Sequence, residues 1–329
     1  MRRVVVGLTV LIVVLAAGAW GWARWYPLSL PDSPYAFSVK AGSSLRSVAR
    51  ELAATGVIPS EWALVGAARL ARADRAIKAG NYELTRGTTL NELLAKLTQG
   101  DATQIAFTIV EGWNVADLRA ALRAKPDIKA TLAEVDNAQM MTRIGGAERE
   151  AEGWFFPDTY FFSSGSTDVS LLARANRLMH ARLDAAWAAR APGLPLVSPY
   201  QALILASIVE KETGRTADRP LIAAVFVSRL RQGMRLQTDP TVIYGLGERY
   251  DGNLHRSDLD ADHAFNTYTR DGLPPTPISL PSQASIDAVL HPPTTPYLYF
   301  VSRGDGSSEF SVTLADHNRA VARYQKRAR

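Results

Sequence analysis

Ser198-Pro-Tyr-Gln-Ala-Leu-Ile-Leu-Ala-Ser-Ile-Val-Glu-Lys-Glu-Thr-Gly214 is the stretch from which the interpretation of this chain begins. It opens with a serine suited to a helix N-cap, a proline suited to the first helical position, and a glutamine that completes a capping box. Gly214 is a natural helix stop. Residues 202–209 are all apolar or small, so the pattern predicts a helix that is buried on most sides.

Glu210 lies where this apolar run ends. It shares a helix face with Ala206 and Ser207, whose small side chains would leave room beside the carboxyl for a ligand. Semi-apolar surroundings disfavour the charged form of a carboxyl, which suits a group that donates a proton. Glu210 is therefore a candidate acid.

Glu212 is the other carboxyl of this stretch. It points about 200° around the helix from Glu210, so the two carboxyls are not expected to act on the same bond. One of them is expected to be an ordinary solvated charge. The residues alone leave open that both are, with Lys211 and Glu212 marking the wet end of a core helix.

The composition is that of a globular protein of about two domains. The chain has 329 residues, of which 47% are hydrophobic and 21% charged, so it has ample material for a core. Its formal net charge is only +5, and no Lys/Arg run of the nucleic-acid-binding type occurs, so no nucleic-acid partner is expected. The absence of cysteine excludes disulfides and thiol catalysis.

The N-terminus has the pattern of a membrane anchor. Residues 1–3 hold two arginines, residues 4–23 carry no charge, and aromatic residues gather at the far end of that run. About 20 apolar residues cross a bilayer as a helix, with basic residues on the cytoplasmic side. We predict a cytoplasmic segment 1–3, a single-pass inner-membrane helix 4–23, a linker 24–36, and a periplasmic remainder. A signal peptide cleaved at Ala17-Gly18-Ala19 is the alternative.

One pattern is written three times along the chain. Each copy begins with alternating apolar residues, turns at a glycine, and continues with helical spacing, which predicts a strand–turn–helix unit. The copies begin at Phe37, Tyr82 and Phe107 and turn at Gly42, Gly87 and Gly112. Residues 37–84 favour a β-α-α-β arrangement, with 60–72 supplying the second helix. The opening of this segment resembles a LysM domain, a family that binds GlcNAc-containing glycans; a purely structural module is the alternative.

The predicted fold class is α+β, with a small LysM-like subdomain at 37–101 and a larger mixed α/β catalytic domain at 102–329. Near the C-terminus, residues 297–302 and 309–313 alternate like the strands of a hairpin. A last helix follows, with Thr313 as its cap and Asp316 three residues on. His317 lies on the apolar stripe of that helix and is predicted to be a packed core residue.

Motifs along the chain resemble, in order, those of the YceG-like family of endolytic murein transglycosylases. They are Glu152-Gly-Trp-Phe-Phe-Pro-Asp-Thr-Tyr160, Ala206-Ser-Ile-Val-Glu-Lys-Glu212, Met234-Arg-Leu-Gln-Thr-Asp-Pro-Thr-Val-Ile-Tyr244, Phe265-Asn-Thr-Tyr268, Gly272-Leu-Pro-Pro-Thr-Pro-Ile278, Tyr297-Leu-Tyr-Phe-Val301 and His317-Asn318. The resemblance covers nearly the whole chain and implies that Glu210 is the catalytic glutamate. The candidate substrate-binding residues, chosen for polar and aromatic groups that suit sugars, are Gln237, Thr238, Asp239, Asn266 and Tyr268. A polar turn with Asp239 as helix N-cap is the alternative for the first three.

What the resemblance implies is cleavage of the MurNAc–GlcNAc β-1,4 bond of nascent peptidoglycan strands without water, leaving 1,6-anhydro-MurNAc ends. One carboxyl would act first as acid and then as base, and the cuts would end strand elongation. The expected partners are glycan strands and the peptidoglycan polymerases. Two alternatives stay open: a hydrolytic muramidase with Asp239 or Glu212 as second carboxylate, and a non-catalytic glycan-binding scaffold.

Metal and cofactor signals fail on inspection. Asp258-x-Asp260-x-Asp262 begins like a calcium loop, but His263 stands where that loop needs glycine and Thr269 where it needs glutamate. The five histidines have no zinc-binding spacing. We therefore predict no metal and no cofactor.

Overall fold

The computed structural model describes residues 18, 21, 25–31, 35–39, 42–73, 77–99, 105–132, 134–162 and 166–324. The chain divides into two compact units, Met1–Phe107 with Phe161–Ser166, and Thr108–Tyr160 with Thr167–Arg329. Most of the predicted anchor at 4–23 lies outside the described residues. Among the residues that are described, no helix has the length and apolarity needed to cross a membrane.

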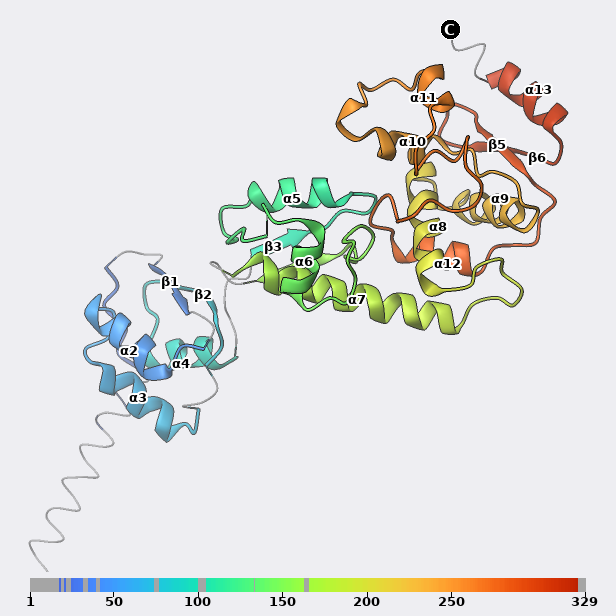
Figure 1. Cartoon of the computed structure of the whole chain (residues 1–329). Helices are drawn as coiled ribbons and strands as arrows, with labels where there is room; N and C mark the ends of the chain where they lie inside the picture. Colours follow the sequence, from blue (N-terminus) through green and yellow to red (C-terminus); the bar gives the residue numbers. More distant parts are fainter. Residues whose placement is uncertain are drawn as a thin grey trace, which may run out of the picture. The chain divides into compact units, whose positions relative to one another are not determined.

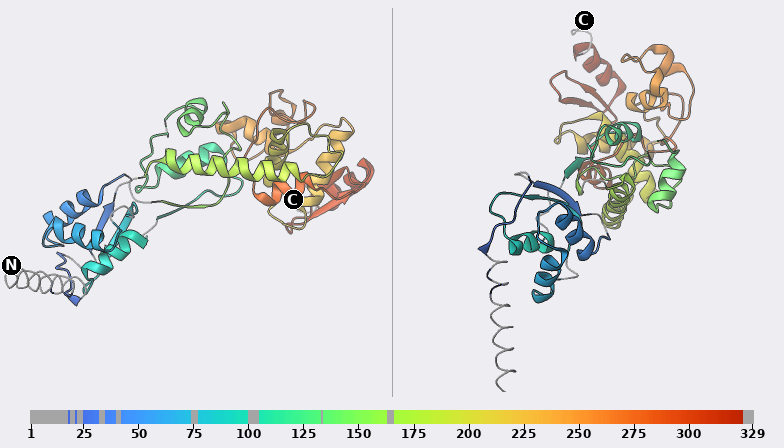
Figure 2. Two further views of the ribbon diagram at one scale, coloured as in Figure 1. Left: turned by 90° about the horizontal axis from the view of Figure 1, so that it is seen from below. Right: turned by 90° about the vertical axis from the view of Figure 1, so that its left-hand side faces the viewer.

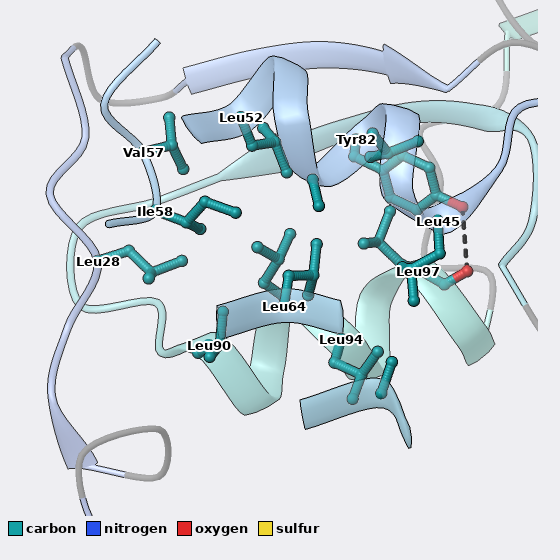
Figure 3. Packing of buried hydrophobic residues seen from close by; sticks show 14 of the residues in the cluster. Leu28, Leu45, Leu52, Val57, Ile58, Leu64, Tyr82, Leu90, Leu94 and Leu97 are labelled. Atoms are coloured by element: carbon teal, nitrogen blue, oxygen red, sulfur yellow. Dashed lines mark hydrogen bonds between the residues drawn. The ribbon is translucent and has the colours of Figure 1, made fainter. Parts of the chain in front are cut away.

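The first unit has the predicted β-α-α-β order (Figure 1). Its elements are β1 (Tyr35–Val39), α2 (Leu45–Ala54), α3 (Glu61–Leu70), β2 (Gly80–Leu84) and α4 (Leu90–Gln99). Strands β1 and β2 pair antiparallel, with Tyr35 opposite Leu84. The helices enclose a core in which Leu52, Leu64 and Leu97 are almost fully buried (Figure 3). The Tyr82 hydroxyl enters this core and donates to the carbonyl of Lys78 at 2.6 Å.

The three predicted glycine turns are confirmed. Gly42, Gly87 and Gly112 have φ values of +81°, +94° and +76°, a conformation that residues with a Cβ adopt only at a cost. Helices α2, α4 and α5 begin three residues after these glycines. The apolar positions that flank each turn most closely are buried, so each repeat contributes one strand end and one helix face to a core.

The second unit contains short strands and many helices. After α4 the elements that follow along the chain are β3 (Ile105–Thr108), α5 (Val115–Arg123), α6 (Asn137–Ile144), β4 (Thr159–Phe162), α7 (Asp168–Ala188), α8 (Pro199–Glu212), α9 (Arg219–Arg231), α10 (Asp239–Leu246), η1 (Gly247–Arg249), α11 (Arg256–Asp260), α12 (Gln283–Leu290), β5 (Tyr299–Ser302), β6 (Ser308–Ser311) and α13 (Leu314–Tyr324). Strand β3 pairs with β4. The fold is mixed α+β. The predicted C-terminal hairpin is confirmed by the antiparallel pair β5–β6.

Helix α8 is the centre of the second unit. It packs against α7, α9 and α12, and the long helix α7 runs beside this group (Figures 1 and 2). Residues 202–209 are all buried, as the sequence predicts. Ser198 accepts from the Gln201 N–H, while Gln201 Oε1 accepts from the N–H of Val197, one residue before the partner that a capping box requires. The helix is thus fixed at its start, and its last turn holds both glutamates.

Gly153 is where the packing around α8 leaves no room for a side chain. Its φ is +83°, and an added Cβ would lie 2.5 Å from Pro277 Cγ and 3.4 Å from Leu203 Cδ2. We expect Gly153→Ala to lower the free energy of unfolding by about 2 kcal/mol, because overpacking and an unfavourable φ add. Urea unfolding followed by circular dichroism measures it. Gly193→Ala has a similar φ but open space around it and is the matched control, with an effect of about 1 kcal/mol.

Candidate active site

A pocket of about 440 Å³ lies in the second unit, beside the end of α8. Four of the predicted substrate-binding residues line it: Gln237, Thr238, Asp239 and Tyr268. Glu212, the last residue of α8, also lines this pocket. Arg229 from α9, Tyr299 from β5 and His317 from α13 complete the part of the lining that carries chemistry.

Glu212 is half-buried, enclosed by protein but open to the pocket. Burial raises the pKa of Glu212 to about 7, and the negative charge of Asp239 adds to the rise, whereas the Thr238 hydroxyl and Arg229 oppose it. Thr238 Oγ1 donates to Glu212 Oε1 in a short hydrogen bond. Within the part of the chain that the structure describes, Oε2 makes no hydrogen bond, so it is the free oxygen of this carboxyl at the pocket. A carboxyl of this kind can both donate and accept a proton near neutral pH.

Glu210 has different surroundings. Its Oε2 accepts from the backbone N–H of Ser282 at 2.9 Å and from the Ser282 hydroxyl at 2.5 Å. Its Oε1 lies 3.6 Å from Arg219 Nη2, and the two side chains are only 6% and 9% exposed. Because Ser282 is the N-cap of α12, Glu210 ties α8 to the start of α12 and to α9.

The two glutamate side chains therefore lie in different surroundings. They diverge, as the helical spacing predicts, and Glu210 is not among the residues that line the 440 Å³ pocket. Of the two carboxyls, Glu212 is the one that lines the pocket, and burial raises its pKa. The expectation that one of the two is an ordinary solvated charge is wrong, because both are shielded and both have polar partners.

Residues 237–239 enter the pocket at the N-terminus of α10. Gln237 has a φ of +49°, which is uncommon for a residue with a side chain, and its N–H donates to the carbonyl of Thr267 at 3.1 Å. The Thr238 N–H donates to the Thr267 hydroxyl, also at 3.1 Å. The segment at Thr267 holds 237–239 in place. The prediction of Asp239 as helix N-cap is wrong by one residue, because Thr238 is the N-cap and Asp239 is the first residue of α10. The polar-turn alternative and the pocket role are thus compatible.

Tyr268 and Asn266 occupy different positions, although they are two residues apart. The Tyr268 hydroxyl donates to Asp239 Oδ1 at 2.5 Å, on the pocket wall. Asn266 is completely buried, and its amide nitrogen donates to backbone carbonyls, including that of Ala261 at 2.7 Å. Its Oδ1 accepts from the Tyr268 N–H at 2.8 Å. The prediction that Asn266 binds substrate is corrected: its polar atoms are occupied, and it orients Tyr268.

Arg229 was not anticipated by the sequence analysis. It is 7% exposed, and it donates to the carbonyls of Leu298 and Leu236 at 2.7 and 2.8 Å. These bonds join α9 to the segment before β5 and to the segment before Gln237. The available signal was an arginine two residues after the buried apolar run Ile222–Val227, in the last turn of α9. A buried cation needs polar partners, and here they are backbone carbonyls of these two segments.

His317 differs from its prediction as a core residue. It is half-buried, stacks on Tyr299 with ring centroids 5.4 Å apart, and lines the pocket. The cap of its helix is confirmed, since Thr313 Oγ1 accepts from the Asp316 N–H at 3.2 Å. The helix of the chain's C-terminal end thus belongs to the site.

A partly desolvated carboxyl beside hydroxyl, amide and aromatic side chains suits the binding of a polar ligand such as a carbohydrate and the transfer of a proton to it. The chain matches the YceG-like family over residues 37–323 and belongs to it. It is 33% identical over 305 residues to an endolytic murein transglycosylase of Bacillus subtilis, covering 87% of this chain and 84% of that protein.

Two further relatives agree with this assignment. An endolytic murein transglycosylase of Streptococcus pneumoniae is 27% identical over 283 residues, which cover 75% of this chain and 51% of that longer protein. A crystal structure of a YceG-like protein from Listeria monocytogenes matches with a TM-score of 0.56 and 26% identity, covering 87% of this chain and 98% of that one.

Proposed function

We propose that this chain cleaves the MurNAc–GlcNAc β-1,4 bond of nascent peptidoglycan strands without water, with Glu212 as the acid and base. Its activity is that of a lytic transglycosylase, a lyase acting within the glycan strand. The observation that carries the proposal is the raised pKa of Glu212 in a pocket shared with Thr238, Asp239 and Tyr268.

The reaction needs only one carboxyl. Protonated Glu212 gives its proton to the glycosidic oxygen as the C1–O bond breaks and positive charge develops on the MurNAc ring. The resulting carboxylate takes the proton from the C6 hydroxyl of the same MurNAc, whose oxygen bonds to C1 and closes the 1,6-anhydro ring. Arg229 and the Thr238 hydroxyl stabilise the carboxylate between the two transfers.

We assign the acid to Glu212 in place of Glu210 for a physical reason. Glu210 Oε2 accepts two hydrogen bonds from Ser282, and its Oε1 lies 3.6 Å from Arg219 Nη2, so both of its oxygens face protein groups. Neither oxygen is among the groups that line the pocket. Among the described residues, Glu212 makes one hydrogen bond, to Thr238, and it lines the pocket, which supports its role in proton transfer.

A hydrolytic muramidase is the second candidate function, because Asp239 lies close enough to raise the pKa of Glu212 and could serve as a second carboxylate. Mass spectrometry of digested glycan strands separates the two. Anhydro-MurNAc ends support the lyase, whereas reducing ends, with ¹⁸O from labelled water, would replace it by the hydrolase. If the folded protein binds glycan strands but releases no fragments, the non-catalytic glycan-binding scaffold would be favoured.

The pH profile follows from the state of Glu212. The acid must be protonated, so we expect kcat/KM to fall as pH rises through about 7, the value to which burial raises the pKa of Glu212. Asp239→Asn removes a negative charge that raises this pKa, so in that variant the fall should begin at lower pH. Steady-state rates between about pH 5 and 9 measure both. If Asp239→Asn does not change the pH at which kcat/KM falls, the group that titrates in this range is not Glu212.

The proposal extends to the rest of the chain. We propose a single-pass anchor at 4–23, a linker at 24–36, a LysM-like glycan-binding module at 37–101 and a catalytic domain at 102–329 in the periplasm, close to where new strands emerge. Peptidoglycan polymerases are the proposed partners, since a cut at the membrane surface would end strand elongation. Membrane fractionation of the full chain and of a chain lacking residues 4–23 tests the anchor.

A further inference from the structure

The C-terminal hairpin and α13 build one wall of the pocket. Leu314, His317 and Val321 of α13 line it together with β5. Their i, i+3, i+7 spacing places them on one face of the helix. Because both elements lie at the end of the chain, this wall is separate in sequence from the segments that hold Glu212 and Asp239. Its chemistry is not used by the proton transfers described above.

Two side chains of this wall, Tyr299 and His317, form a stack with Arg229 of the neighbouring helix α9. The Arg229 guanidinium lies 5.1 Å from the centroid of the Tyr299 ring, and the His317 ring lies 5.4 Å from it at an interplanar angle of 26°. Arg229 is fixed by bonds to the carbonyls of Leu236 and Leu298. A ring stacked on a fixed partner loses little freedom when a ligand binds, which favours a preorganised contact.

The hydrogen bonding of His317 defines the form of its imidazole. Its Nδ1 is buried and has no hydrogen-bond partner within the described part of the chain. Burial and the charge of Arg229 lower the pKa of His317, so the ring is neutral near pH 7. A buried N–H without an acceptor costs more than an unpaired acceptor nitrogen, so the proton belongs on Nε2. His317 therefore offers one donor, Nε2–H.

We propose that His317 is a substrate-contacting residue, whose Nε2–H donates to an oxygen of an N-acetylated sugar bound beside Glu212. This inference rests on the proposed function, because it names a contact within the same pocket. The stack on Tyr299 fixes the position of the His317 ring, and the apolar side chains of Leu314 and Val321 line the pocket beside it. A flat apolar surface with one donor is suited to the face of a sugar and one of its oxygens.

The test compares a variant that keeps the ring with one that keeps the donor. In a full chain made inactive by Glu212→Gln, calorimetry measures binding of a tetrasaccharide of alternating GlcNAc and MurNAc. His317→Phe keeps an aromatic stack but removes the donor, so we expect affinity to fall roughly five- to tenfold, the loss of one neutral hydrogen bond. His317→Gln keeps an N–H at similar reach and should recover most of it. Asn318→Ala, at an exposed neighbouring position, should bind like the parent.

Two results would overturn the inference. One is that His317→Phe binds the tetrasaccharide as tightly as the parent. The other is that the Gln and Phe variants lose affinity equally and both melt at lower temperature, which would make His317 a structural residue of the hairpin. The products of the wild-type chain test the proposed function separately, since anhydro ends can form whether or not His317 touches the sugar.

Discussion

Glu212→Gln is expected to reduce the rate of glycan cleavage by about a thousandfold, because glutamine can neither donate nor accept the proton in both steps. Binding of glycan should survive, since the amide has the same shape and can still meet the Thr238 hydroxyl. The measurement is release of anhydro-ended fragments from purified strands, quantified by chromatography and mass spectrometry. Affinity for a short strand is measured in parallel.

Glu210→Gln is the matched control, with the same change two residues away on the same helix. We expect it to keep most of the turnover, because its side chain is engaged with Ser282 and Arg219 and not with the pocket. The opposite pattern, an active Glu212→Gln and an inactive Glu210→Gln, would return the catalytic role to Glu210. Circular dichroism of both variants ensures that the comparison is between folded proteins.

Arg219→Met is expected to give the largest loss of stability, about 3 kcal/mol in the free energy of unfolding. The substitution leaves the Glu210 carboxylate buried without its cation, and removing one partner of a buried ion pair is strongly destabilising. We take the lower end of the usual range because the pair is 3.6 Å apart and Ser282 still donates to Glu210. Urea unfolding at pH 7 measures the change.

The double variant Arg219→Met/Glu210→Gln separates the charge from the packing. Removing both charges should restore much of the stability, because no unpaired carboxylate then stays buried. Arg256→Met is the surface control: its partner Asp260 is exposed, so a change below about 0.5 kcal/mol is expected. A double variant no more stable than Arg219→Met would mean that Arg219 stabilises the fold through its packing rather than through Glu210.

The predictions from sequence are confirmed most often for features that depend on residues close together in the chain. The glycine turns, the cap and burial of α8, the C-terminal hairpin and the Thr313 cap of α13 were all predicted from residues close in sequence. Such features depend on φ preferences, side-chain periodicity and capping, which a few adjacent residues set. The same local logic placed Asp239 at the start of α10 and Tyr268 near a polar segment.

The errors arise where distant segments meet. Asn266 has the residue type of a sugar ligand, but the turn of 258–261 occupies its amide. His317 lies on an apolar helix stripe, but that stripe faces a pocket. Arg229 bonds the carbonyl of Leu298, 69 residues away, a contact that no local pattern encodes.

The sequence by itself determined the family, the buried helix, and the presence of two carboxyls on diverging faces of its last turn. Only the tertiary structure decided which carboxyl lines a pocket. Helix α12 and Arg219 cover Glu210 with donors, while α10, the hairpin and α13 leave a pocket in front of Glu212. The physical reason is that the protonation of a carboxyl depends on the partners and solvent around it, and segments far apart in the chain supply both.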